Sequence, residues 1–184
     1  MAGELERLRA ELAEARRLAR LDPLTRAWNR RAVVELLHGE LARARRERSR
    51  VAVLFIDLDR FKRINDRQGH AAGDAVLCEA AARMRAVVRP YDPVGRYGGD
   101  EFVVIIAGTG AARGAARAAA AIAAGLRERP VVTPAGSVCM TASIGLAVAP
   151  AGARDPHRLI ADADRAMYAA KRAGGDAVRD DSPS

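Results

Sequence analysis

The chain has 184 residues and a formal charge of +8, and 49% of its residues are apolar. This length suits one domain with a short appendage, and the two cysteines make neither a disulfide framework nor a zinc site. No stretch approaches the roughly 20 consecutive apolar residues that span a bilayer, and the start lacks a secretory signal, so we expect a soluble cytoplasmic protein without a membrane segment. Aromatic residues make up only 4%, which leaves few platforms for stacking bases and argues against a nucleic-acid partner.

The first segment repeats small apolar residues at spacings of three and four from Leu5 to Ala19. A coiled-coil seam of about two and a half heptads fits this pattern, and so does a lone amphipathic helix that packs on its own domain. Both interpretations stay open, because a firm assignment needs about three to four heptads. Asp22-Pro23 interrupts the pattern, so we predict an N-terminal signalling helix or coiled-coil segment over residues 1–21.

The rest of the chain alternates helical and strand-like segments. We predict helices over 29–48, 71–88, 111–127 and 157–173, and strands over 51–58, 93–97, 102–107 and 138–148. A hairpin inside this order excludes an all-parallel dinucleotide-binding sheet. We therefore expect an α/β fold of the α+β type, with a ferredoxin-like or palm-type mixed central sheet flanked by helices. That layout places the end of the first strand beside the tip of the hairpin.

The most informative segment is the predicted hairpin tip, Gly98-Gly99-Asp100-Glu101. A glycine pair between two strands indicates a tight turn whose central residues need positive φ and let a ligand approach the backbone. Two adjacent carboxylates repel each other unless a cation or a donor-rich ligand neutralises them. Asp57 ends the first strand, beside the hairpin, so carboxylates at both places can share a metal. The pattern indicates a metal–nucleotide site.

With the following phenylalanine, this tip resembles the signature of the GGDEF family, the diguanylate cyclases that condense two GTP into cyclic di-GMP. An isolated Gly-Gly-Asp-Glu is more often an exposed turn with incidental acids. Here four motifs occur in the right order over about residues 20–178. The resemblance implies a catalytic domain over residues 22–178, followed by a disordered tail over 179–184.

The resemblance implies a metal site at the end of the first strand. Asp57 and the Leu58 carbonyl are expected to be metal ligands, and Asp100 the bridging ligand and candidate proton acceptor. Glu101 is expected to assist metal binding or to orient the turn. The ions implied are Mg²⁺ or Mn²⁺, two per active half-site.

Only two of the 31 basic residues are lysines, Lys62 and Lys171, which suggests a chemical role for each. The resemblance implies that Lys62 neutralises charge over the triphosphate in the transition state, and that Lys171 binds terminal phosphates. Backbone N–H groups at Arg60 and Phe61 are expected to cradle phosphates, as helix starts do. The open backbone of Gly98 and Gly99 is assigned to the same substrate site.

Asn65, His70 and Asp74 lie in a stretch that resembles the guanine-recognition segment of the family. An amide can donate to the acceptors of guanine, and a carboxylate can accept from its N1–H and exocyclic amine. Taken alone, Asn65 could instead cap a turn and Asp74 the following helix. No second histidine lies near His70, so we do not expect it to bind a metal.

Arg89 and Asp92 have the spacing of the family's product-inhibition site, where cyclic di-GMP would bind. An arginine can fork onto guanine O6 and N7 while the aspartate accepts from the Watson–Crick edge. Arg117 is a further candidate donor. The alternative is a plain surface pair at a helix end.

Two positions depart from the family pattern. Gly175 stands where an arginine is usual, which removes one expected phosphate contact. Arg26 replaces the glycine of the usual Leu-Thr-Gly-Leu, in a segment that we interpret as a latch between the N-terminal helix and the domain. Loss of that glycine is expected to alter coupling more than chemistry.

The resemblance also implies a homodimer, because each domain binds one GTP and two domains must face each other across their hairpins. The main alternative is a catalytically weak or silent GGDEF domain that senses GTP or cyclic di-GMP. A third possibility, nucleotidyl transfer onto a polynucleotide, needs a basic groove with stacking aromatics, which the sequence does not offer.

Overall fold

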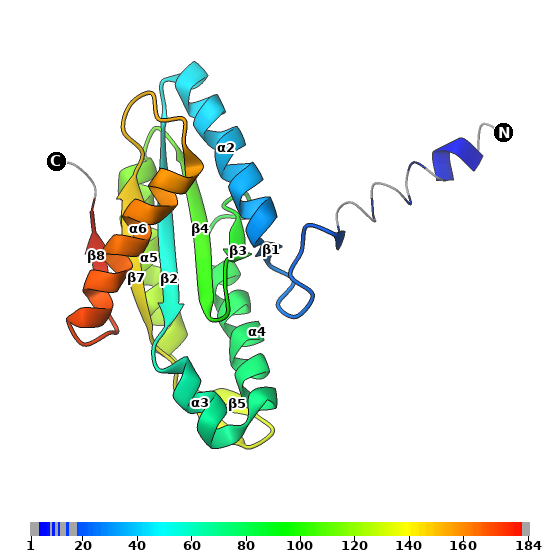
Figure 1. Cartoon of the computed structure of the whole chain (residues 1–184), viewed down its shortest axis with the longest axis vertical. Coiled ribbons are helices and arrows are strands. Elements are labelled where there is room, and N and C mark those ends of the chain that lie inside the picture. Colours follow the sequence, from blue (N-terminus) through cyan, green and yellow to red (C-terminus); the bar gives the residue numbers. More distant parts are fainter. Residues whose placement is uncertain (1–3, 8, 10, 12–13, 15–17, 182–184) are drawn as a thin grey trace.

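The computed structural model describes residues 4–181, apart from 8, 10, 12–13 and 15–17. Most seam positions of the predicted signalling segment over 1–21 lie outside the described residues, so the choice between coiled coil and lone helix stays a prediction. From residue 18 onward the described chain is continuous, and its centre is a six-stranded sheet between helices (Figure 1).

The sheet is mixed, as the sequence predicts. Its order is β1-β3-β4-β2-β7-β8, with β2 antiparallel to both of its neighbours and parallel pairs at the two edges. The strands are β1 (Trp28–Asn29), β2 (Arg50–Leu58), β3 (Val94–Arg96), β4 (Glu101–Gly108), β7 (Ala142–Val148) and β8 (Val178–Asp180). The predicted first strand is thus the centre of the sheet.

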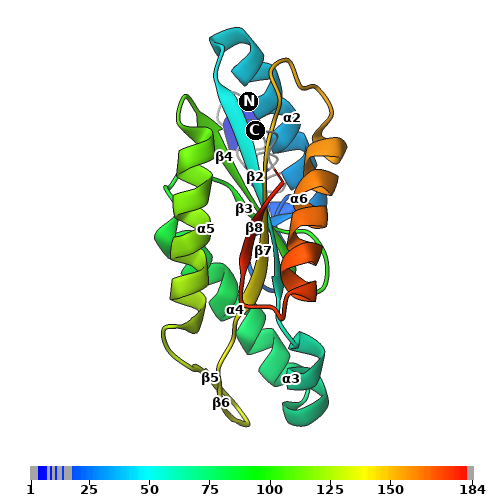
Figure 2. The same cartoon turned by 90° about the vertical axis from the view of Figure 1, so that its left-hand side faces the viewer.

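Helices cover both faces of this sheet (Figure 2). The helices are α2 (Arg30–Glu47), α3 (Phe61–Gln68), α4 (His70–Val87), α5 (Ala111–Arg127) and α6 (Pro156–Arg172). Alternate residues of β2 pack with α4 and α5 on one face and with α2 and α6 on the other. This two-sided burial explains why the sequence of β2 is a nearly unbroken apolar run. In the described part of the chain, no helix combines the length and the apolar character needed to cross a membrane.

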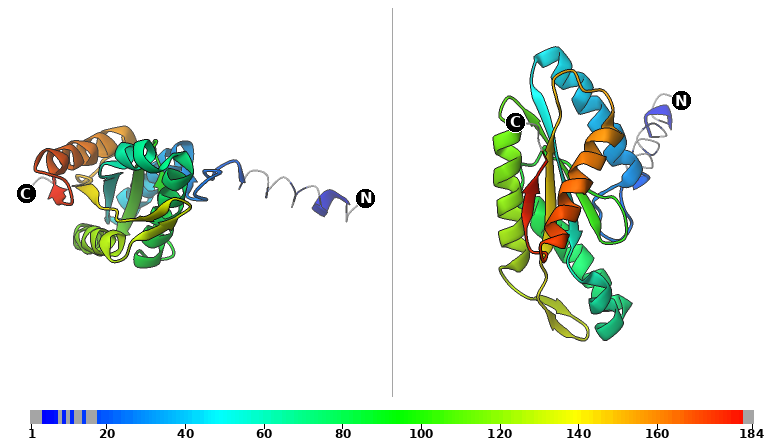
Figure 3. Two further views of the ribbon diagram at one scale, coloured as in Figure 1. Left: turned by 90° about the horizontal axis from the view of Figure 1, so that it is seen from below. Right: turned by 60° about the vertical axis from the view of Figure 1, so that its left-hand side comes forward.

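Besides the two-residue strand β1, the structure contains three features that the sequence pattern did not predict. Helix α3 is short and has no buried side chain, so it lacks the apolar stripe that would reveal it. The predicted strand over 138–148 is two strands, because β6 (Gly136–Val138) pairs instead with β5 (Val131–Thr133) in a separate ribbon beside α3. Figure 3 shows this ribbon at the lower end of the molecule.

The third element corrects the predicted tail. Residues 179–180, which we assigned to a disordered segment, belong to β8 and pair in parallel with β7. All three residues of β8 are exposed and form no apolar pattern. The strand therefore depends on the open edge of β7, which only the tertiary structure provides.

Candidate active site

Asp57 lies at the end of the central strand, where the chain is still covered on both sides. It is only 5% exposed, and burial raises its pKa to about 6. The hydrogen bond from the Lys171 ammonium opposes that rise, while the neighbouring carboxylates reinforce it. Lys171 Nζ lies 2.6 Å from Asp57 Oδ2. The other oxygen, Oδ1, is buried and has no hydrogen-bond partner among the described residues.

The hairpin brings two further carboxylates beside Asp57. Glu101 is the residue opposite Asp57 in the β2–β4 register, and the Leu58 N–H donates to the Asp100 carbonyl at 3.3 Å. Burial raises the pKa of Glu101, and nearby carboxylates raise it further. The predicted proximity of strand end and hairpin tip is therefore present in the structure.

The turn itself differs from the predicted one. Gly98 and Gly99 are absent from the residues with left-handed φ, and four residues, 97–100, connect the strands. The first glycine is required for another reason, since a Cβ on Gly98 would overlap the Glu101 carboxylate. Around Gly99 the space is open, so the turn is accessible from outside. The two glycines therefore allow other groups to approach the backbone of the turn closely, and they are not required for a left-handed φ.

The residues at this end of β2 fit a divalent cation. Two carboxylates and a backbone carbonyl are hard oxygen donors, and the unpartnered Asp57 Oδ1 is a buried acceptor that a cation would satisfy. Within the described residues, no group of three or more Asp, Glu, His or Cys side chains could hold a metal alone. A cation held here would therefore need further oxygen ligands from outside these side chains.

The predicted guanine residues lie where α3 meets α4. A Cβ on Gly73 would collide with the Asn65 amide and crowd the Phe61 ring, so both side chains lie against the start of α4. Asp74 follows directly and is exposed, as is His70. No side chain caps α4, which argues against the alternative that Asp74 is a helix cap. The structure thus places the amide and the carboxylate at neighbouring positions of the two helices.

The predicted phosphate residues occupy the turn between β2 and α3 and the end of α6. Arg60 is the N-cap of α3, with a left-handed φ of 57°, and Phe61 begins the helix. Lys62 is exposed, and its side chain makes no ion pair or hydrogen bond within the described residues. The ion pair between Lys171 and Asp57 joins the end of α6 to the predicted metal ligands.

Asp59 is a residue that our sequence reasoning missed. Its carboxylate accepts hydrogen bonds from the hydroxyls of Thr141 and Ser143, both at 2.7 Å, and from the Asp176 N–H at 2.8 Å. It thereby joins the end of β2 to β7 and to the loop after α6. Gly175 has a φ of 78°, and a Cβ there would press on the Asp59 carboxylate. The only signal for this role in the sequence is that Asp59 is a second aspartate, two residues after Asp57.

A second missed group connects the hairpin to the N-terminal latch. The Arg96 guanidinium donates to the Gly99 carbonyl at 3.0 and 2.8 Å and lies 3.3 Å from Asp22. Burial would raise the pKa of Asp22, but hydrogen bonds from Thr25 and the charge of Arg96 outweigh it and lower the pKa. The latch segment is thus joined to the predicted catalytic turn by one arginine.

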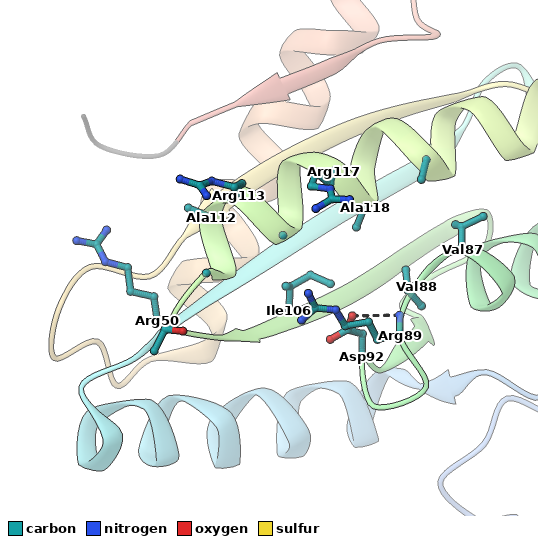
Figure 4. A pocket seen from close by; sticks show the side chains of 14 residues that line it. Arg50, Val87, Val88, Arg89, Asp92, Ile106, Ala112, Arg113, Arg117 and Ala118 are labelled. Atoms are coloured by element: carbon teal, nitrogen blue, oxygen red, sulfur yellow. Dashed lines mark hydrogen bonds between the residues drawn. The ribbon is translucent and has the colours of Figure 1, made fainter.

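The predicted product-inhibition residues line one cavity, at the other end of β2 from Asp57. Its volume is about 750 Å³, and Arg89, Asp92 and Arg117 share its walls with Arg50 and Arg113 (Figure 4). Such a volume is typical of ligand pockets.

The charges in this cavity do not form the surface pair that was our alternative. Asp92 is 7% exposed, burial raises its pKa, and its carboxylate accepts from the backbone N–H of Arg89 at 3.2 Å. The Arg89 guanidinium lies over the Tyr91 ring at 5.8 Å instead. The other three arginines make no ion pair within the described residues, so the cavity carries an excess of cationic side chains.

Comparison with known proteins identifies the family. The family model described as "Diguanylate cyclase, GGDEF domain" matches residues 19–177. The chain belongs to the GGDEF domain family. The predicted resemblance and the predicted fold class are both confirmed.

Several GGDEF relatives are similar over most of this chain. Diguanylate cyclase TpbB of Pseudomonas aeruginosa is 44% identical over 90% of the chain and 38% of that protein, and the bifunctional protein MucR of the same species is 40% identical over 95% of the chain and 25% of its own length. The chain therefore spans less than two fifths of these curated relatives.

Solved GGDEF structures superpose closely on the chain. The coiled coil and GGDEF domain of DgcB from Caulobacter crescentus, solved in complex with c-di-GMP, gives a TM-score of 0.89 at 31% identity, over 97% of this chain and 94% of that one. The isolated GGDEF domain of TpbB gives a TM-score of 0.82 at 43% identity, over 87% and 93% of the two chains.

Proposed function

We propose that this domain condenses two GTP molecules into cyclic di-GMP and releases two pyrophosphate ions. The observation that carries the proposal is the buried Asp57, which has one oxygen bonded to Lys171 and the other without a partner in the described residues. Two further carboxylates lie beside it on the hairpin. These carboxylates form a negatively charged centre that a cation would balance, and the Lys171 ammonium beside them could bind phosphate.

Asp57, the Leu58 carbonyl and Asp100 would hold the divalent ion, and Glu101 would support them. When bound, Mg²⁺ or Mn²⁺ polarises the α-phosphate and lowers the pKa of the attacking hydroxyl. We propose two such ions per active half-site. The donor set contains only oxygen, which is the preference of both ions.

The chain's own residues bind and orient the nucleotide. Asn65 and Asp74 would read the guanine edge, and the amide is already positioned against α4 by Phe61 and Gly73. Lys62 and Lys171 would neutralise the phosphates. Because Lys171 is already fixed by Asp57, its ammonium is preorganised for an incoming phosphate.

The reaction step is a displacement at phosphorus. A 3′-oxygen of one GTP forms a bond to the α-phosphorus of the other, the bond to the β-phosphate oxygen breaks, and pyrophosphate leaves with that electron pair. Asp100, on the accessible turn, would accept the hydroxyl proton. The step occurs twice per cyclic product, so two domains must present their hairpins to each other in a homodimer.

The proposal places the domain in the cytoplasm, where its nucleotide substrate is found. It also assigns the cavity around Arg89 and Asp92 to cyclic di-GMP as an inhibitor. The cationic excess and the volume of that cavity support a ligand with two phosphates and two guanines. The c-di-GMP complex of DgcB supports a cyclic di-GMP ligand in a structurally similar domain.

The test is to incubate the chain with GTP and Mg²⁺ at high protein concentration and to separate the nucleotides. We expect cyclic di-GMP and pyrophosphate in a ratio of one to two, and a loss of at least about 10³-fold in rate for Asp100→Ala. Arg46→Ala, an exposed change on α2, is the matched control and should keep the rate. Absence of cyclic dinucleotide, with GTP still bound, would favour the alternative of a silent sensor domain.

A further inference from the structure

A second cavity lies on the flank of α3, away from the side where Asn65 meets α4. Its volume is about 470 Å³. The walls come from the β2–α3 turn, from α3, from the connection between β6 and β7, and from the loop after α6. We name this cavity the α3 arginine pocket. Its main lining side chains are Arg60, Arg63, Arg67, Ile64, Gln68 and Cys139.

The position of α3 is fixed, so the pocket is part of the fold. Phe61 and Asn65 anchor one side of the helix against Gly73 of α4. On the pocket side, the Thr133 hydroxyl donates to Gln68 at 3.1 Å and joins the helix to the β5–β6 ribbon. Figure 2 shows α3 and this ribbon at the same end of the molecule.

Three arginines of this pocket have no anionic partner. Arg60, Arg63 and Arg67 are exposed and make no ion pair or side-chain hydrogen bond within the residues that the structure describes. Arg63 and Arg67 are four residues apart on one helix, a spacing at which like charges repel each other and destabilise the helix. An anion bound between them would remove that repulsion.

The two carboxylates in the walls are already used by other groups. Asp59 accepts from two hydroxyls and a backbone N–H, and Asp176 is paired with Arg127 at 3.0 Å. Neither makes an ion pair with the three guanidinium groups, and two carboxylates balance at most two of these three positive charges. The local charge surplus is positive, and it is built from side chains that bind phosphate oxygens in pairs.

The lining selects among anions. No aromatic side chain lies in the walls, so a nucleotide base finds no stacking surface there. Three guanidinium groups spread over two helical turns suit an anion with more than one phosphate group. The pocket also adjoins the proposed triphosphate site, because Arg60 contributes its backbone to that site and its side chain to the pocket.

We propose that the α3 arginine pocket binds an oligophosphate anion, and that its ligand is the pyrophosphate released by the reaction. This inference rests on the proposed cyclase function for the source of the ligand. Facing hairpins in a dimer would cover the turn side of the nucleotide site. The flank of α3 then offers leaving pyrophosphate a cationic surface directly beside the phosphates.

The test measures binding without turnover, by calorimetric titration of pyrophosphate into the full chain in the presence of EDTA and without GTP. We expect the double variant Arg63→Gln with Arg67→Gln to weaken binding by about tenfold or more, because each loses a charge-assisted contact. The matched control is Arg45→Gln with Arg46→Gln, which removes the same charge from the last turn of α2, outside both cavities, and should leave binding unchanged. All four side chains are exposed, so neither double variant changes the core.

Three further arms identify the ligand and its site. Inorganic phosphate should bind at least about tenfold more weakly than pyrophosphate, because it reaches fewer guanidinium groups. GTP should compete poorly at this pocket. Lys62→Gln should retain the pyrophosphate affinity that the Arg63 and Arg67 variant loses.

The proposal is overturned if the two double variants weaken binding equally, or if Lys62→Gln alone abolishes it. It is also overturned if GTP binds through Arg63 and Arg67 as tightly as pyrophosphate, since the ligand would then be a nucleotide tail. Because no GTP is turned over in the titration, failure here leaves the cyclase proposal standing. An inactive cyclase would likewise leave the binding result interpretable.

Discussion

The two ends of strand β2 are built in opposite ways. At the Asp57 end, carboxylates are buried and held by neighbouring strands, and a lysine is already bonded to one of them. At the Arg50 end, roughly 26 Å away at about 3.3 Å per residue, arginines project into an open cavity and make no ion pairs within the described chain.

The difference follows from the ligand that each end is proposed to bind. A cation site binds its ion more tightly when its carboxylates are buried. A desolvated carboxylate is unfavourable while it is charged and unpaired, and a bound metal ion compensates that charge. An anion site on a surface needs long, exposed cationic side chains that can close on a ligand. The Asp57 end therefore lowers the stability of the fold before its ligand binds, and the Arg50 end is completed by its ligand.

The largest expected effect comes from Asp57→Asn. We expect loss of at least about 10³-fold in cyclase rate, since the substitution removes a proposed metal ligand. The pKa of Asp57 is raised from 3.8 to about 6, so the folded state binds this proton more tightly than the unfolded state. The stabilisation from that proton is full below pH 4 and is lost as the pH rises through 6.

Without metal, Asp57→Asn should therefore become more stable relative to the original chain between pH 4 and pH 8, by about 1–3 kcal/mol. Urea unfolding in EDTA at several pH values measures this difference. Added Mg²⁺ at pH 8 should stabilise the original chain and not the variant. A stability difference that does not vary with pH would contradict the buried, cation-seeking carboxylate.

At the other end, Arg89→Ala should raise the concentration of cyclic di-GMP needed for half-inhibition by about tenfold or more, because one forked contact to guanine or phosphate is lost. Initial rates at increasing product concentration provide the measurement. Arg129→Ala, an exposed arginine outside the cavity, is the matched control. An unchanged response of Arg89→Ala to product would remove the inhibition site from the proposal.

The smallest effect is expected in the latch that holds the catalytic turn through Arg96. Arg26 has a φ of 58°, a conformation that favours glycine, and its side chain is exposed. Arg26→Gly relieves this strain but adds freedom to the unfolded chain, so we expect a net stabilisation of about 0.5–1 kcal/mol. Thermal unfolding measures it, with Arg31→Gly, inside α2, as a control that should destabilise. Equal destabilisation by both changes would show that residue 26 is not strained.

Much of the fold was predictable because the pattern of apolar residues is strong. The four predicted strands and the four long helices follow from burial, and α5 was predicted with its observed bounds. The failures are short elements without such a pattern, namely α3, the β5–β6 ribbon and β8. Each depends on a neighbour far away in the sequence, as the Thr133 to Gln68 hydrogen bond illustrates.

The predicted site was assembled from motifs, and its residue roles stay predictions. What the structure adds is the contacts between motifs. The roles of Asp59 and Arg96 were missed because their partners, Thr141 and Asp22, are far away in the sequence and only the fold brings them together. The turn at Gly98 was given the wrong backbone angle, because the sequence does not reveal the Glu101 carboxylate that lies against it.

The sequence by itself determined the family, the mixed α/β fold and the residue types available for chemistry, since these follow from local pattern and motif spacing. The tertiary structure decided which charges are neutralised and which remain without partners. Lys171 meets Asp57 across more than a hundred residues, while Arg63 and Arg67 meet no carboxylate among the described residues. Partnering depends on distance and burial in three dimensions, and these are set only when the strands and helices pack.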